Sequence, residues 1–544
     1  MKILNLFFPS VYDDDGRVNQ RLTVHHALYF LMLVVLVGSQ SVSNYMMSAM
    51  QILLAVNWAL EWDIRRKFQR PMQPLLWSFL VLFGVLLLWM IPTAHQVTGW
   101  NELFSKLPLL AIPLVVLTSR PLSSKQLSFL VFAYCATVFV ATVIGHVRHY
   151  LMPELEYRDI IPFISHIRFA LNVCMVVVFM LAYLLEHTRR HGKVSVAVSL
   201  AVVVMTAYFL HFLLLIHSYT ALIILFVVSL VMLACFGHRI AHKGLRRTLW
   251  LLFSTSTVAI ALLVGVCVRD YYKPISLVTE PLAPSTANGN PYLHKQNGYI
   301  ENGNLIDNYI CNVELEKEWC KRSSMPLDTL TPMGYTVYPA LLRYLNAIGT
   351  TKDSVGMQLL TDDDIRAIEE GIANPVYLHG SKLREMVYVM LFEYESYRIF
   401  GAVKNFSVLQ RLELWRNTWK VFLRSPLFGC GTGDLEHECL TELAKSRSPL
   451  ADHPRNPHNQ YLSSLASFGI VGSFIIAVAF VWGLRMLRLR HRPLLVAYLV
   501  VLLISFISEN TLSTLAGCVF ATTFFSLLGR RESAQSLSDH SSTP

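Results

Sequence analysis

The sequence is short of charge. Of its 544 residues 54% are hydrophobic and only 15% are Asp, Glu, Lys or Arg, whereas soluble domains carry about a quarter charged residues. The charges lie in short stretches between long apolar runs, and no Asp or Glu lies in the middle of a run; Glu186 and Glu509 stand at run ends. Proton-coupled transporters normally need a carboxylate within the membrane. This absence therefore counts against a transporter.

Two further absences narrow the chemistry. No C-x-x-C pair occurs among the nine cysteines, and no other metal-ligand spacing stands out, so we expect no metal and no resident cofactor. The first apolar run follows the acidic stretch Asp13-Asp14-Asp15 and lacks a clear small-residue cleavage site. We expect it to be retained and not removed as a signal peptide.

Twelve apolar runs have about the length that crosses a bilayer, although three of them are short. The sequence therefore predicts an all-α, polytopic membrane protein with about twelve transmembrane helices. The predicted spans are 24–42, 46–60, 74–92, 107–118, 127–146, 168–186, 194–215, 219–236, 248–268, 462–484, 494–507 and 510–528.

The distribution of basic residues predicts the orientation. With a cytoplasmic N-terminus, the inner connections hold 22 Lys and Arg, and the short outer connections hold only Lys106, Arg148 and Arg158. Basic residues favour the cytoplasmic side, so residues 269–461 lie outside the cytoplasm. This loop has 20 basic and 23 acidic residues. The net charge of +10 thus comes from the inner connections, and nucleic acid is not expected as a partner.

Composition predicts four parts. They are an N-terminal membrane bundle of about nine helices (1–268), a mainly helical periplasmic loop domain (269–461), about three C-terminal membrane helices (462–528) and a disordered cytoplasmic tail (529–544).

Local signals predict structure within the large loop. Residues 274–304 are rich in Pro, Asn and Gly and should be irregular. Thr361 begins a helix-capping pattern, and a long helix should end at Gly401. Residues 407–424 place Val408, Leu412, Trp415, Trp419 and Phe422 on one helical stripe, which predicts an amphipathic helix on the membrane surface or over the bundle.

The nine cysteines divide by compartment. Five lie in apolar runs, where cysteine acts as a small hydrophobic residue. The other four lie in the large loop, and they form two pairs with members nine residues apart, Cys311 with Cys320 and Cys430 with Cys439. An even number in an oxidising compartment predicts two local disulfides.

Basic and histidine side chains gather at the predicted outer ends of the spans. His166 and Arg168 stand at the start of the sixth span, and His217 lies in the turn between the seventh and eighth. Such a cluster suits an anionic headgroup such as a diphosphate. The residues alone equally allow Arg168 to reach the phosphate of an ordinary lipid.

A second polar cluster, Arg455 to Leu462, precedes the tenth span. A helix N-terminus favours phosphate oxygens, and a neutral His458 there can accept a proton from an attacking hydroxyl. The residues alone favour the simpler interpretation, in which Asn459 caps the helix and His458 only packs beside it.

Three motifs resemble those of the O-antigen ligase and O-antigen polymerase superfamily, and O-antigen ligases most closely. They are H-N-Q-Y-L-x-x-L-x-x-x-G-x-x-G from His458, R-x-x-x-W from Arg411, and P-L-F-G-C-G-x-G from Pro426. The resemblance covers most of the chain in predicted topology and is specific in sequence over about 405–475.

The resemblance implies a GT-C-like glycosyltransferase of the bacterial inner membrane with a periplasmic active site. The donor is a glycan on undecaprenyl diphosphate and the acceptor a lipid A-core sugar hydroxyl, in an inverting, metal-independent transfer among membrane lipids. His458 matches the motif base, Arg411 matches the arginine that holds the diphosphate, and Arg168 matches an arginine at the outer end of a mid-chain span. Asn459, Arg455, His166 and His217 are further candidates. Where the family often has Ser-Arg-Thr/Gly, this chain reads Ser218-Tyr219-Thr220, which leaves open whether His217 replaces the missing Arg.

Other activities fit the same motifs. An O-antigen polymerase or a protein O-oligosaccharyltransferase differs only in its acceptor, which is a second lipid-linked glycan or a Ser/Thr side chain. A flippase for lipid-linked sugars is a more remote alternative, because it accounts neither for the large loop nor for the lack of carboxylates within the spans.

Overall fold

The computed structural model forms two compact units, which we call the bundle unit (Met1–Leu249 with Leu414–Pro544) and the insert unit (Trp250–Glu413). The helices α12 (Lys243–Tyr272) and α19 (Ser407–Arg424) cross the boundaries between them. The structure describes residues 7–12, 17–63, 67, 74–152, 154–191, 195–240, 243–273, 282–295, 298–401, 407–451, 456–487 and 489–530.

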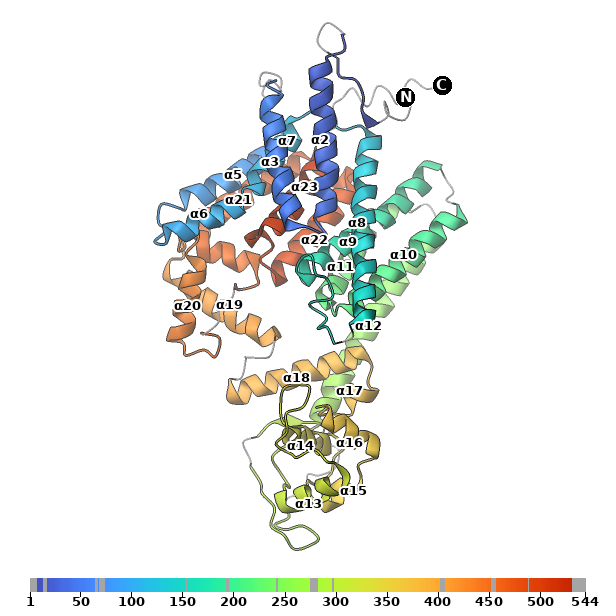
Figure 1. Cartoon of the computed structure of the whole chain (residues 1–544), viewed down its shortest axis with the longest axis vertical. Coiled ribbons are helices and arrows are strands. Elements are labelled where there is room, and N and C mark those ends of the chain that lie inside the picture. The colour runs from blue at the N-terminus through green and yellow to red at the C-terminus, as the bar shows by residue number, and fades with distance from the viewer. Residues whose placement is uncertain are drawn as a thin grey trace. The chain divides into compact units, whose positions relative to one another are not determined.

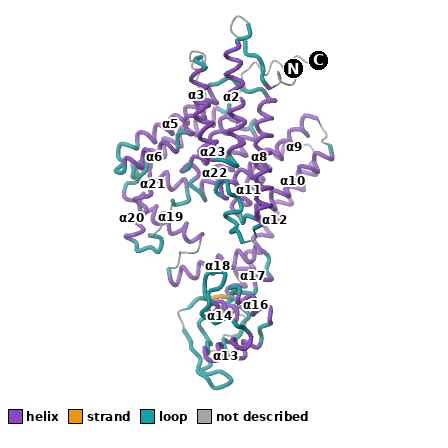
Figure 2. The backbone as a smooth tube through the Cα atoms, in the orientation of Figure 1, coloured by secondary structure: helices purple, strands orange, loops and turns teal. Residues whose placement is uncertain are grey.

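The described part of the bundle unit is helical (Figures 1 and 2). Its α-helices are α2 (Gln20–Ser39), α3 (Asn44–Leu60), α5 (Pro74–Leu88), α6 (Gln96–Ser105), α7 (Pro108–Thr118), α8 (Ser124–Leu151), α9 (His166–His191), α10 (Val196–Leu215), α11 (Tyr219–Phe236), α20 (Leu435–Lys445), α21 (Gln460–Met486), α22 (Pro493–Ser508) and α23 (Leu515–Gly529). Short 3₁₀ helices are η1 (Gly237–Arg239), η2 (Leu489–His491) and η3 (Thr511–Ser513).

The chain is a multi-pass membrane protein. Among the described residues, eight helical segments are long and apolar enough to cross a membrane, and α5, α22 and α23 are shorter apolar helices. With α3, every predicted span coincides with a helix, so the all-α, polytopic fold is confirmed. The fourth span differs in detail, because α6 precedes α7 and a new helix begins at Pro108, where proline is well tolerated.

Helices far apart in the sequence pack together in the bundle unit. Helix α5 contacts α21, α7 contacts α23, and α22 contacts both α9 and α11. One apolar core joins these helices, with fully buried Phe169 on α9 and Tyr498 on α22. The C-terminal helices are thus built into the N-terminal bundle. The division of the chain at 268/269 and 461/462 stays a prediction.

The insert unit is a small helical domain with one two-residue hairpin. Its elements are β1 (Ile300–Glu301), β2 (Asn304–Leu305), α13 (Asn312–Arg322), α14 (Val337–Ala347), α15 (Ser354–Gln358), α16 (Asp362–Glu369), α17 (Val376–His379) and α18 (Lys382–Phe400). Trp319, Leu341 and Ile368 lie in its apolar core. Glu301 forms a two-bond pair with Arg343, at 2.9 and 3.1 Å, which ties the hairpin to α14.

Two local predictions for the loop are confirmed. Thr361 caps α16 in a reciprocal capping box with Asp364. Helix α18 ends at Gly401, which adopts φ 62°, the left-handed conformation that favours glycine at a helix C-terminus.

The face that α19 buries differs from the predicted stripe. Of that stripe Phe422 is buried, whereas Leu412 and Trp419 are each 47% exposed. The buried face instead includes Leu414, Asn417 and Val421. This face can include the polar Asn417 because its side chain accepts a hydrogen bond from Ser446. The spacing of apolar residues in the sequence does not reveal this partner.

The structure has neither of the two expected disulfides, and all four loop cysteines are free. Cys311 and Cys320 lie at opposite ends of α13, and nine residues of helix span about 13 Å, more than the roughly 7 Å that a disulfide tolerates between Cα atoms. Cys430 and Cys439 share a small apolar cluster. The Cys439 thiol lies 3.4 Å from the Thr418 hydroxyl.

Candidate active site

His458 pairs with an acidic residue that follows α22. Its Nδ1 lies 3.2 Å from Oε2 of Glu509, and the two side chains are 36% and 14% exposed. When Nδ1 carries the proton and donates it to the carboxylate, Nε2 is left without a proton and can accept one. The pair therefore has the arrangement of a general base held in one tautomer by a carboxylate.

The residues that follow His458 hold this pair in place. Asn459 caps α21 by accepting a hydrogen bond from the Leu462 N–H at 3.0 Å. Gln460 accepts from the Leu512 N–H at 2.9 Å, and the Ser463 hydroxyl donates to Asn510 at 3.0 Å. The start of α21 is thus fastened to the turn that carries Glu509. The H-N-Q motif therefore positions the histidine and its partner together.

The backbone of His458 adopts φ 50°, which is uncommon for a residue other than glycine and which histidine tolerates better than most. Such conformations cost about 1–3 kcal/mol and often occur at functional sites. Trp415 supports this turn from α19 by donating its indole N–H to the Pro457 carbonyl at 2.7 Å.

The glycine-rich motif that begins at Pro426 forms backbone hydrogen bonds with α21 where that helix is interrupted. Gly469 interrupts this helix at φ 63°, and a Cβ there would lie 2.3 Å from the Leu427 carbonyl carbon. Irregular backbone at membrane depth must find hydrogen bonds elsewhere in the protein. Four bonds supply them: Cys430 N to Ala466 O, Gly431 N to Ser467 O, Ile470 N to Pro426 O and Val471 N to Leu427 O.

Arg168 lies within the electrostatic influence of Glu509. It stands in the first turn of α9, which packs against α22, and its side chain is half-buried. Glu509 therefore pairs with the imidazole of His458 and attracts the guanidinium of Arg168 without forming an ion pair with it. A base with a cation in the same part of the bundle suits a reaction in which a proton leaves one oxygen and negative charge grows on another.

The two other predicted histidines meet at one aromatic ring. Tyr157 lies 4.9 Å from the His217 ring and 6.0 Å from the His166 ring, between centroids. His217 also stacks on Tyr219, at 6.1 Å. Tyr219, which occupies the place of the family's arginine, thus packs beside His217.

Two predicted arginines lie outside the described part of the bundle unit. Arg411 lies on α19 and belongs to the insert unit, where it is half-buried. Arg455 lies outside the described residues. Their roles in substrate binding stay predictions.

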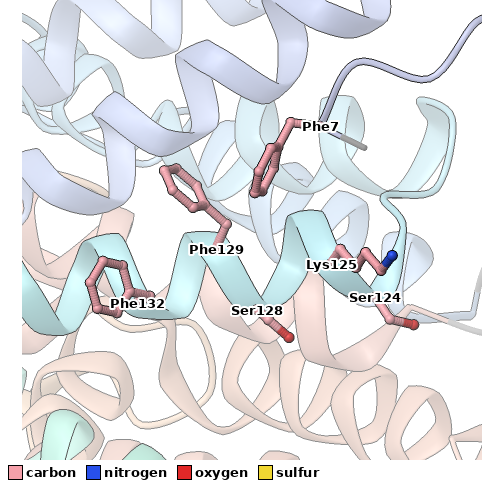
Figure 3. A pocket seen from close by; sticks show the side chains of 6 residues that line it. All are labelled: Phe7, Ser124, Lys125, Ser128, Phe129 and Phe132. Atoms are coloured by element: carbon pink, nitrogen blue, oxygen red, sulfur yellow. The ribbon is translucent and has the colours of Figure 1, made fainter. Parts of the chain in front are cut away.

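A cavity beside the start of α8 lies away from His458. Figure 3 shows Phe7 and Phe129 facing each other beside the first turns of α8, with Lys125 nearby. The cavity measures about 410 Å³. By the predicted orientation it faces the cytoplasmic side, whereas His458, Arg168 and Glu509 lie at the outer ends of their helices.

The sequence did not identify Glu509 as a site residue. In the sequence Glu509 is an acidic residue at the end of an apolar run, 51 positions after His458, and no motif connects the two. Its carboxylate borders an otherwise apolar segment, and acidic residues near spans are often functional. That signal could have marked Glu509 as a candidate.

Comparison with known proteins identifies one family. Residues 384–477 match the family described as O-antigen ligase. The matched segment includes His458, Asn459 and Arg411. The match confirms the resemblance to the O-antigen ligase and polymerase superfamily and supports a glycosyltransferase of that general type. No curated protein matches the chain.

Proposed function

We propose, from the superfamily signature in residues 384–477, that this chain transfers a glycan from undecaprenyl diphosphate to a sugar hydroxyl of lipid A-core. The reaction takes place on the periplasmic face of the bacterial inner membrane, without a metal. The observation that carries this proposal is the pair of His458 and Glu509, 3.2 Å apart, with Arg168 close enough to feel the charge of Glu509.

In the proposed reaction, the acceptor oxygen attacks the anomeric carbon of the donor sugar from the side opposite the diphosphate. The new bond forms as the bond from that carbon to the phosphate oxygen breaks, and undecaprenyl diphosphate leaves. One displacement inverts the anomeric configuration. Nε2 of His458 receives the acceptor proton, and Glu509 stabilises the resulting imidazolium.

Arginine side chains stabilise the leaving group in this proposal. Negative charge grows on the diphosphate as the bond breaks, and fixed cations placed there lower the barrier. Arg168 supplies one such cation and Arg411 a second.

Since guanidinium binds phosphate oxygens through two parallel hydrogen bonds, Arg411→Lys should restore only part of the activity that Arg411→Ala removes. Arg416, an exposed arginine on the same helix, provides the control substitution.

The acceptor is what distinguishes the competing activities. Purified protein in detergent is mixed with undecaprenyl-diphosphate-linked glycan and, separately, with lipid A-core, with additional lipid-linked glycan, or with a Ser/Thr-containing peptide. We expect a glycosylated product with lipid A-core. Product only from the second or third mixture would identify a polymerase or a protein O-oligosaccharyltransferase. Movement of labelled donor across liposomes, with no transfer in any mixture, would favour a flippase.

A further inference from the structure

Gln40 is a buried amide without a partner. It follows the last residue of α2, its side chain is 2% exposed, and neither its Nε2 nor its Oε1 has a hydrogen-bond partner among the described residues. A buried polar group left unpaired costs about 1–3 kcal/mol. Such a group calls for an explanation, such as a bound water or a ligand.

The amide of Gln40 lines a small cavity together with Arg168, Asn172 and Thr511. The cavity measures about 10 Å³, which is close to the least space that holds one water. It therefore takes a single oxygen-sized group. A whole phosphate does not fit inside it, but one oxygen of a phosphate that lies against Arg168 does.

The other polar side chains of the cavity already have partners. Asn172 accepts from the Tyr134 hydroxyl at 2.7 Å and donates to the Arg168 carbonyl at 2.9 Å. The Thr511 hydroxyl lies 3.1 Å from that of Ser505. Among the described polar side chains that line the cavity, the Gln40 amide and the Arg168 guanidinium are the two that make no hydrogen bond within the protein.

We propose that Gln40 is a donor-binding residue, whose Nε2 donates a hydrogen bond to one phosphoryl oxygen of the lipid diphosphate that Arg168 holds. This inference rests on the proposed function. The site binds an oxygen that accepts hydrogen bonds from an amide and a guanidinium. This oxygen could belong to a phosphoryl group or to a water molecule. The two sources differ in what happens when the amide is removed, because only the phosphoryl oxygen belongs to the substrate.

An apolar replacement separates binding from stability. Gln40→Leu removes the unpaired amide at similar volume, so the ligand-free protein should melt at a higher temperature. The same change should weaken the binding of undecaprenyl diphosphate about tenfold or more, because hydrogen bonds to charged groups are among the stronger ones. Gln40→Glu should weaken binding further, since a carboxylate repels phosphate. Isothermal titration of the detergent-solubilised protein with undecaprenyl diphosphate measures the affinity.

Gln51 provides a matched control. It is also a buried glutamine, on α3, but its amide donates to the Met47 carbonyl of its own helix at 2.9 Å. Gln51→Leu should leave the affinity unchanged. If Gln40→Leu does not fold, Gln40→Asn, which keeps an amide but withdraws it by one methylene, should show the loss of affinity instead.

The outcomes distinguish the two proposals. If the native protein does not bind undecaprenyl diphosphate, the proposed function fails. If the native protein binds it and the folded Gln40 variants bind it equally well, the amide holds only water, and the role of Gln40 in donor binding is overturned while the proposed function stands.

Discussion

At the scale of single residues, the site depends on what lies beside His458. A histidine next to a helix N-terminus has many roles, but a histidine whose Nδ1 faces a carboxylate has its tautomer determined. The motif indicated His458 from the sequence, because its residues are consecutive. Glu509 and Gln40 could not be found that way, since their significance lies in contacts between segments that are distant in the chain.

The role of Glu509 leads to the first prediction. Glu509→Gln removes the charge that orients and stabilises the imidazole, so kcat should fall, by less than the roughly 10²–10⁴-fold that a general base contributes. The KM for the donor should change little, because Glu509 pairs with His458 and makes no ion pair with Arg168. Steady-state kinetics with varied donor measure both constants. A higher KM with unchanged kcat would contradict the role of Glu509 in supporting the base.

At the scale of helices and turns, the sequence pattern predicted the elements that depend on neighbouring residues. It did not predict the features that depend on contacts between distant segments. The helices at the predicted spans, the capped start of α16 and the end of α18 at Gly401 follow from neighbouring residues. The break in α21 does not, because it needs residues 426–431 to supply hydrogen bonds from outside the helix. The prediction of the disulfides was wrong for a similar reason. The spacing of Cys311 and Cys320 in the sequence does not show that helix α13 separates them.

The second prediction concerns these thiols. Cys320 is exposed, so it should be alkylated quickly in the native protein without reductant. Cys439 should react slowly, since burial raises the pKa of its thiol to about 11 and only the thiolate attacks. All four loop cysteines should react after unfolding. Mass spectrometry of the unreduced protein measures which cysteines are alkylated. A Cys311–Cys320 disulfide in these spectra would contradict the structure.

The third prediction concerns Glu393 on α18, which is 8% exposed. Burial raises the pKa of its carboxyl to about 7, above the value near 4.3 of an unfolded chain. The folded state therefore favours the neutral acid, and this stability is present below about pH 4.3 and is lost as the pH rises through 7. Glu393→Gln should increase stability at pH 8, by at most about 4 kcal/mol, and much less at pH 4.5.

Melting temperatures of the solubilised protein at the two pH values test this prediction. Glu385, on the same helix, is more exposed and pairs with Lys382 at 3.0 Å, so Glu385→Gln is the control and should change little at either pH. A Glu393→Gln variant that melts like the native protein at pH 8 would show that the carboxyl carries no burial penalty.

At the scale of the whole molecule, composition was enough to predict a helical, multi-pass membrane protein, because a bilayer permits few other structures for long apolar runs. It was not enough to predict how the C-terminal helices join the bundle. The packing of α22 against α9 is what brings His458, Glu509 and Arg168 together from three separate parts of the sequence.

The measurement that tests the account most directly is single-turnover transfer by the His458→Asn variant at saturating donor. Asparagine tolerates a positive φ and keeps a polar side chain, but it cannot take up the acceptor proton. We expect the variant to fold, to bind undecaprenyl diphosphate like the native protein and to transfer glycan to lipid A-core about 10²–10⁴-fold more slowly. Transfer at the native rate would contradict the assignment of His458 as the base.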